Sequence, residues 1–243
     1  MDFSYNKVAE KLDIILDTAL HHRKQVLIGI VGAVALTTAI IGYLHYRTVQ
    51  QAAAHKDFIE ALRYYESPVT GSKTVMTADV VEFATDQDKW KNVEEIFRKG
   101  YQKHRSTGLG SMFHAYQANA LARLGELDQA IDILNAAIKE IPNKEIKDFY
   151  LLNLALLKLD SKDQAVQQEG FDQLFKIAQD DQSYANESAL YYLGAYFWDK
   201  KDYAQVKNYW QQLMVKYGLK EAKQQSGFGE IVRAKLKLIS PEW

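Results

Sequence analysis

The chain has 243 residues and a mass of 27.8 kDa, enough for one medium domain with an appendage or for two small domains. Its 30 Lys and Arg residues nearly balance 31 Asp and Glu residues, so no global positive field favours nucleic acid. The lack of cysteine excludes disulfides, thiol catalysis and thiolate metal sites. Three prolines and 13 glycines are too few for a many-stranded β protein, and the composition therefore predicts an all-α fold.

A stretch of 22 residues without formal charge, 25–46, predicts a transmembrane helix. At about 1.5 Å per residue, such a helix reaches about 33 Å and exceeds a hydrocarbon core of about 30 Å. Tyr43 and Tyr46 lie where an interfacial aromatic belt is expected. The alternatives are a buried core helix and a signal peptide cleaved after the small residues 52–54. The length of the span and of the 24 residues before it favours a membrane anchor.

The basic residues beside the span indicate its orientation. Arg23-Lys24 directly precede the span, whereas Arg47 stands alone after it. Because Lys and Arg concentrate on the cytoplasmic side, this asymmetry predicts a cytoplasmic N-terminus and a C-terminal domain outside the cytoplasm. Residues 1–24 then form a cytoplasmic amphipathic segment, in which apolar residues recur at helical spacing over residues 3–20.

The first helical unit of the extracytoplasmic part is expected to cover residues 47–105. The membrane helix continues into this unit, because no helix breaker occurs before Ser67-Pro68. An insertion follows at about residues 69–87, with a turn-like start and room for one short helix over residues 76–86. A second helix is predicted from Asp88 to His104, because apolar side chains recur there on one face.

Residues 106–243 contain internal repeats that predict a short tetratricopeptide-like α-solenoid. In residues 111–144 the small, turn and terminating positions of one repeat are occupied by Ala118, Gly125, Ala130, Ala137 and Pro142. Ala118 is followed by small residues at Ala155 and Gly194, at steps of 37 and 39 positions, which are close to a repeat of about 34 residues. Residues 228–239 predict a helix that caps the last apolar face. The predicted fold class is all-α, with a single N-terminal transmembrane helix followed by the solenoid.

The sequence shows no recognisable motif of catalytic or metal-binding residues. His21-His22 have no partners at the spacing of a zinc site. The carboxylate pairs Glu94-Glu95 and Asp180-Asp181 lie at or near predicted helix starts, where acidic side chains interact favourably with the helix dipole. Asn186-Glu187-Ser188 matches a glycosylation acceptor and equally suits a helix start. We therefore expect no catalytic, cofactor or metal site, with an envelope enzyme using unrecognised carboxylates as the weaker alternative.

The concave groove of a solenoid is lined by the first helix of each repeat and is the expected place for a protein partner. The residues of these helices that are not needed for helix crossing are Asn119, Arg123, Leu152, Leu156, Tyr191 and Trp198. The alternative for each is packing against a neighbouring helix or the cap. Aromatic residues crowd into residues 191–210, and most of them are expected in the core between stacked helices.

In its order of segments the chain resembles the YfgM-like family, ancillary subunits of the bacterial SecYEG translocon. The resemblance lies in the single span, the helix with residues 58–62 that follows it, and the repeat around 118–122 with Gly125. It implies a bacterial inner-membrane protein with a periplasmic repeat domain. The insertion at 69–87 and the aromatic third repeat depart from the family's pattern.

The expected function is a membrane-anchored protein-interaction module. The resemblance implies partners among a SecYEG-type translocon, a periplasmic chaperone and translocated polypeptides. The balanced charge of the chain predicts no nucleic acid partner. A scaffold or regulatory adaptor that acts through its membrane helix is the main alternative.

Overall fold

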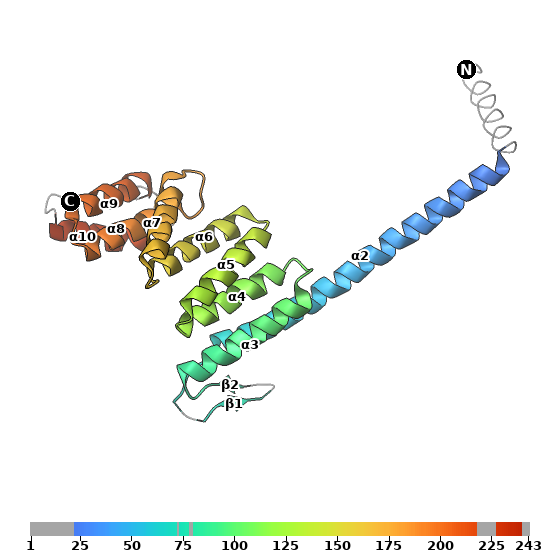
Figure 1. The fold of residues 1–243 in the computed structure, drawn as a ribbon, viewed down its shortest axis with the longest axis horizontal. Helices are drawn as coiled ribbons and strands as arrows, with labels where there is room; N and C mark the ends of the chain where they lie inside the picture. Colours follow the sequence, from blue (N-terminus) through green and yellow to red (C-terminus); the bar gives the residue numbers. More distant parts are fainter. Residues whose placement is uncertain (1–21, 72, 78–79, 218–226, 240–243) are drawn as a thin grey trace, which may run out of the picture. The chain divides into compact units, whose positions relative to one another are not determined.

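The computed structural model of the chain describes residues 22–71, 73–77, 80–217 and 227–239. In these ranges it contains nine α-helices, α2 to α10, and two short strands, β1 and β2, so the fold is all-α as predicted (Figure 1). The chain divides into two compact units, Met1–Ala53 and Ala54–Trp243. The amphipathic helix predicted over residues 3–20 lies outside the described residues.

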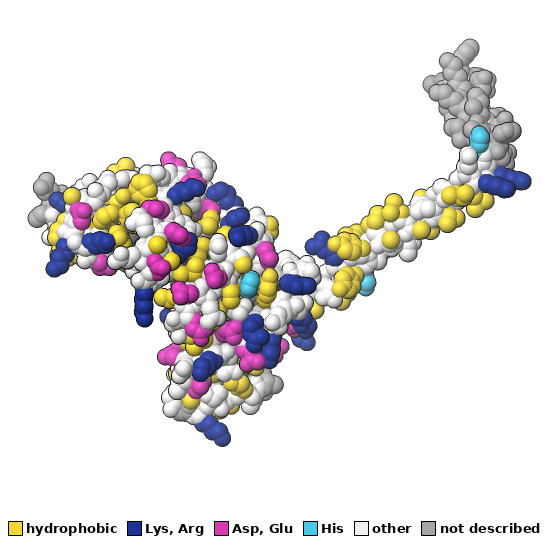
Figure 2. Space-filling model, viewed as in Figure 1, with side chains coloured by type: hydrophobic (Ala, Val, Ile, Leu, Met, Phe, Trp, Pro, Cys, Tyr) yellow, Lys and Arg dark blue, Asp and Glu magenta, His cyan; other side chains and the backbone are white. Residues whose placement is uncertain are grey.

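Helix α2 (Arg23–Glu66) contains the predicted membrane segment. It is the one helix within the described ranges that is long and apolar enough to cross a membrane. Side chains between residues 22 and 49 are exposed wherever they are described, and Figure 2 shows hydrophobic side chains along this part of the helix. The hydroxyls of Thr37 and Thr38 donate to backbone carbonyls four residues earlier, at 2.8 and 2.9 Å, so neither leaves an unpaired polar group.

The last turns of α2 belong to the second unit and supply part of its core. Ala54 and Ala61 have no exposed surface. Phe58 packs edge-on against three aromatic rings at centroid distances of 5.0 to 5.9 Å, namely Phe97, Phe113 and Tyr116. These edge-to-face contacts add to the apolar area that the aromatic side chains bury.

The insertion forms a β-hairpin, and the short helix predicted over residues 76–86 is wrong. Strand β1 (Val75–Met76) pairs antiparallel with β2 (Val81–Glu82), with Met76 opposite Val81. Phe83 is fully buried next to this pair, and its backbone bridges to Val69. Alternate burial of Val81 and Phe83 is a strand pattern with a period of two, which a helix cannot satisfy.

Helix α3 (Asp86–His104) confirms the helix predicted from Asp88, and it starts two residues earlier. The side chain of Thr85 caps its N-terminus by accepting a hydrogen bond from the backbone N–H of Asp88 at 3.1 Å. Val93 and Phe97 are fully buried, so α3 turns one apolar face toward α2 and α4.

Three antiparallel helix pairs and a final helix follow along the chain (Figure 1). Their bounds are α4 (Gly110–Arg123) with α5 (Leu127–Glu140), α6 (Lys144–Leu159) with α7 (Gln164–Gln179), α8 (Asn186–Asp199) with α9 (Tyr203–Tyr217), and α10 (Gly227–Ile239). Each helix from α3 onward packs against its neighbours in the chain, and α10 contacts both α9 and α8. Contacts between sequential neighbours are the defining property of a solenoid, which confirms the predicted architecture.

The small residues used to align the first repeat lie where the helices cross. Ala118, Ala130 and Ala137 have no exposed surface. Gly125 ends α4 with a φ angle of 81°, a left-handed conformation that glycine adopts without steric cost. The predicted alignment of residues 111–144 therefore agrees with the helix pair α4 and α5.

Candidate functional site

The acidic pairs named from the sequence are engaged in local structure. Glu94 accepts a hydrogen bond from Gln117 at 2.8 Å, and Glu95 forms an ion pair with Lys99 at 2.7 Å. The Asp180 carboxylate accepts the backbone N–H of Gln182, and Asp181 pairs with Lys216. Among the residues that the structure describes, no three His, Asp or Glu side chains lie close enough together to hold a metal ion.

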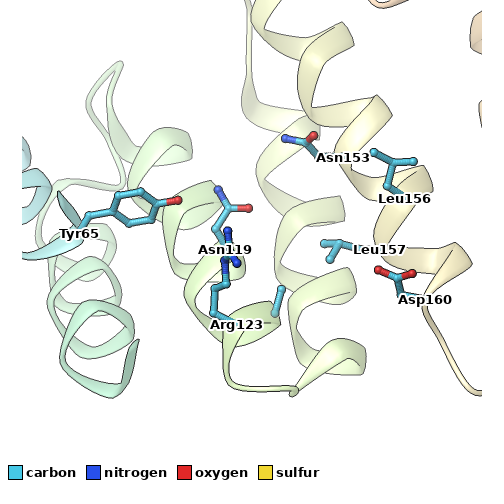
Figure 3. A pocket seen from close by; sticks show the side chains of 8 residues that line it. Tyr65, Asn119, Arg123, Asn153, Leu156, Leu157 and Asp160 are labelled. Carbon is cyan, nitrogen blue, oxygen red and sulfur yellow. The ribbon is translucent and has the colours of Figure 1, made fainter. Parts of the chain in front are cut away.

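An open pocket of about 250 Å³ lies in the second unit between α2, α4 and α6 (Figure 3). Its walls are formed by Tyr65, Asn119, Ala122, Arg123, Asn153, Leu156, Leu157 and Asp160. The structure therefore brings together three of the six residues predicted for the groove, which are Asn119, Arg123 and Leu156.

Each helical wall of the pocket carries one carboxamide, Asn119 on α4 and Asn153 on α6. They are 34 positions apart, whereas the step from Ala118 to Ala155 is 37, so the position that corresponds to Asn119 on α6 is Leu156. In Figure 3 the two carboxamides lie on facing helices, and the Tyr65 hydroxyl points toward Asn119. The pocket thus combines hydrogen-bonding groups with an apolar side.

A tryptophan supports the charged wall of the pocket. The guanidinium of Arg123 lies 5.6 Å from the centre of the Trp90 ring, and the ammonium of Lys89 lies 4.8 Å from the same centre. Tyr65 meets Trp90 edge-on at 5.4 Å. Lys89 donates to the backbone carbonyl of Ser67 at 2.7 Å, and burial lowers the pKa of its ammonium. Arg123 itself is exposed to the solvent at the pocket.

Leu152 lies in the core and not on the groove surface. Only 5% of its surface is exposed, and it packs in the cluster that contains Leu174 and Leu193. Helix α6 has a neighbour on each side, α5 and α7, so its apolar residues are divided between two interfaces. The prediction placed Leu152 in the groove as a residue of a first helix that is not needed for helix crossing, but its burial leaves almost no surface for a partner.

Tyr191 and Trp198 pack against the cap, which was the alternative considered for them. Tyr191 stacks on Phe228 of α10 with ring centroids 4.2 Å apart. Trp198 stacks on Trp210 at 5.5 Å, and Lys235 of α10 lies 5.1 Å from the Trp198 ring centre. Both side chains are partly buried by these contacts, so they belong to the end of the solenoid.

Five of the eight residues that line the pocket were not predicted from the sequence: Tyr65, Ala122, Asn153, Leu157 and Asp160. The last four lie within four positions of a predicted residue of α4 or α6. Tyr65 carried no comparable signal, since it comes from α2 and reaches the pocket only through the packing of α2 on α3 and α4.

The possible glycosylation acceptor Asn186 is a structural residue. It is 1% exposed, and its amide group donates to the backbone carbonyls of Ile177, Ala178 and Asp180. Its side-chain oxygen accepts hydrogen bonds from Lys216 and Tyr217. Asn186 therefore joins the end of α7 to the start of α8 and to α9.

The fold and the pocket define a class of protein: a helical-repeat domain with an open polar pocket, in a chain that also carries a helix apolar enough to cross a membrane. Comparisons of the chain with protein-family models, with curated proteins and with solved structures give no match.

Proposed function

We propose that the protein is a single-pass membrane protein whose repeat domain binds polypeptide partners in the pocket formed by α2, α4 and α6. The observation that carries this proposal is the pair Asn119 and Asn153, which line the pocket from the facing helices α4 and α6. A carboxamide both donates and accepts hydrogen bonds, so two of them on opposite walls can bind the N–H and C=O groups of an extended chain. Leu156 and Leu157 provide apolar contact beside them.

A binding role is favoured over catalysis by the state of the acidic residues. The carboxylates of Glu94, Glu95, Asp180 and Asp181 take part in capping, hydrogen bonds or ion pairs. The pocket itself contains one carboxylate, that of Asp160. Acid–base catalysis by a carboxylate pair requires two such groups on either side of the reacting bond of one substrate.

Retention of α2 as an anchor is supported by its continuity. The helix runs without interruption through residues 52–54, where a signal peptidase would have to cut. Ala54 is fully buried in the second unit. Cleavage at this position would remove most of α2 and leave only its last turns, which contribute to the core. The charge asymmetry of Arg23-Lys24 against Arg47 supports an N-terminus in the cytoplasm.

The resemblance to the YfgM-like family supports a more specific role. It places the protein in the bacterial inner membrane with the repeat domain in the periplasm, beside a SecYEG-type translocon. The polypeptides bound in the pocket would then be newly translocated chains or a periplasmic chaperone. The open form of the pocket is suited to chains that bind briefly and are released.

Site-specific photocrosslinking in native membranes tests the proposal. A benzoylphenylalanine at Ala122, which lines the pocket, should capture polypeptides on irradiation. The same residue at Val215 of α9, a position outside the pocket with 73% exposure, is the matched control and should capture far less. Equal capture at the two positions would contradict the assignment of the pocket as the binding surface.

A further inference from the structure

Two cations lie over one aromatic ring, Arg123 as a lining residue of the pocket and Lys89 beside it. Arg123 and Lys89 both lie over Trp90, at 5.6 and 4.8 Å from the ring centre. Over the part of the chain that the structure describes, no carboxylate lies within 4 Å of either group. Burial is the main cause that lowers the pKa of Lys89, the nearby Asp86 raises it, and the charge of Arg123 lowers it further. The α4 wall of the pocket therefore carries a positive charge, that of Arg123, which forms no ion pair with a carboxylate in the described part of the chain.

The aromatic support fixes the guanidinium before a ligand arrives. Contact with Trp90 restricts the long Arg123 side chain, and Trp90 is itself held by the edge of Tyr65. A guanidinium presents its N–H donors in a planar fork that matches the two oxygens of a carboxylate. Because the side chain is already restricted, binding a carboxylate requires little additional loss of conformational entropy.

We infer that the pocket selects an extended polypeptide segment with an acidic side chain, whose carboxylate binds Arg123 while Asn119 and Asn153 bind neighbouring peptide groups. The inference rests on the proposed function and specifies its ligand. Arg123 lies one helical turn after Asn119 on α4, so a single segment can reach both. Lys89 increases the positive potential at the same wall.

Asp160 determines which wall of the pocket the acidic side chain of the ligand faces. It lies at the end of α6, on the pocket wall that α6 provides, and its side chain is exposed. A carboxylate at this wall repels an acidic side chain, so the acidic residue of the ligand faces α4. Removal of the Asp160 charge should strengthen the preference for an acidic segment, and removal of the Arg123 charge should abolish it.

Peptide titration of the full chain in detergent micelles tests the inference. The probes are labelled decapeptides of alternating Ser and Leu, acetylated and amidated, with a central Glu, Gln or Lys. The Glu peptide should bind about tenfold more tightly than the Gln peptide, as expected for one charge-assisted hydrogen-bonded pair. Arg123→Gln should remove this difference with unchanged circular dichroism, Asp160→Asn should increase it, and Arg233→Gln, at an exposed position of α10, should leave it intact.

The outcomes separate this inference from the proposed function. Equal affinity of the parent protein for the Glu, Gln and Lys peptides overturns the acidic preference. Failure to bind any of the three peptides, while Ala122 still crosslinks polypeptides, also overturns it. In both cases the proposed function stands. A Gln peptide with a free C-terminal carboxylate that matches the Glu peptide also overturns the choice of an acidic side chain. Loss of selective crosslinking at Ala122 overturns the proposed function itself.

Discussion

At the scale of single residues, Gly194 leaves room for the indole of Trp210. A Cβ atom on Gly194 would lie 2.0 Å from Nε1 of Trp210, far inside van der Waals contact. Trp210 has no exposed surface, and its Nε1–H donates to the backbone carbonyl of Tyr191 at 3.1 Å. The indole cannot retreat without breaking this hydrogen bond, so the tight approach of α8 and α9 depends on the glycine.

Gly194→Ala should therefore lower the free energy of unfolding by about 1–3 kcal/mol through overpacking. This loss is expected even though alanine has a helix propensity about 1 kcal/mol better than glycine. Gly227→Ala is the matched control, because nothing lies within 4 Å of its added Cβ. Chemical denaturation of the two full-length variants, followed by circular dichroism, measures the difference. Identical unfolding midpoints would show that α8 and α9 separate easily at this point.

Asp57 provides a prediction about pH. Its carboxylate accepts a hydrogen bond from Lys103 and shares another with Nε2 of the buried His104, both at 2.7 Å. The hydrogen bond from Lys103, followed by that from His104, lowers the pKa of Asp57 below its ordinary value of 3.8. A carboxyl group with a lowered folded-state pKa stabilises the protein above its unfolded-state pKa, and this stability is lost as the pH falls through the folded-state pKa.

We expect Asp57→Asn to melt at a lower temperature than the parent at neutral pH. The difference should narrow as the pH falls below 3.8, because the parent then protonates Asp57 and loses the same interaction. Thermal melts of both proteins between neutral pH and about pH 2 measure the convergence expected from this linkage. A difference in melting temperature that keeps its size throughout the titration would contradict the assigned role of the Asp57 charge.

At the scale of the elements, the capping helix α10 carries one buried and one exposed leucine. Leu236 has no exposed surface and belongs to the cluster that contains Trp210, whereas Leu238 is 76% exposed. Leu236→Ala should destabilise the protein by about 2–5 kcal/mol, since it leaves a cavity against the last repeat. Leu238→Ala should change stability by no more than about 0.5 kcal/mol. Equal effects of the two substitutions in a denaturant titration would mean that α10 does not cover the solenoid as the structure shows.

The helix pairs could be predicted from the sequence because their signals are local. In residues 111–144, small residues, Gly125 and Pro142 each report a crossing, a turn or an end within a single repeat. The hairpin over residues 69–83 could not be predicted in the same way. Its strands are two residues long, too short to show a period, and they are held in place by the burial of Phe83.

The groove residues could be predicted only in part, because the sequence does not show how each helix is rotated about its own axis. Asn119, Arg123 and Leu156 line one pocket because α4 and α6, the first helices of two successive helix pairs, both contribute to its walls. Leu152 was misplaced because α6 packs on both sides, and one sequence does not reveal which interface takes each apolar residue. Trp198 is covered by α10, whose packing partners are distant in the sequence.

At the scale of the whole chain, the two ends of helix α2 have different surfaces. The part of α2 before residue 50 exposes its apolar side chains; Leu27, Ile28 and Leu36, for example, are 63 to 72% exposed. In water this surface would oppose solubility, whereas in a bilayer it is the surface that stabilises the helix. The last turns of α2 bury Ala54 and Ala61 against other helices. The sequence change from apolar to amphipathic within one helix therefore coincides with the change from an exposed apolar surface to packing against other helices.

The last prediction concerns retention and orientation of this helix in the membrane. The full chain should remain in the membrane pellet after alkaline carbonate treatment, because its apolar segment is long enough to span the bilayer. In right-side-out inner-membrane vesicles, added protease should digest the C-terminal domain. Arg23→Glu combined with Lys24→Glu should produce a mixed orientation, since it removes the basic residues on which the proposed cytoplasmic N-terminus depends. Arg47→Glu, which changes the lone charge on the other side, should leave the digestion complete. A C-terminal domain protected in the parent would reverse the assigned orientation, and a mature N-terminus at His55 would identify α2 as a cleaved signal sequence.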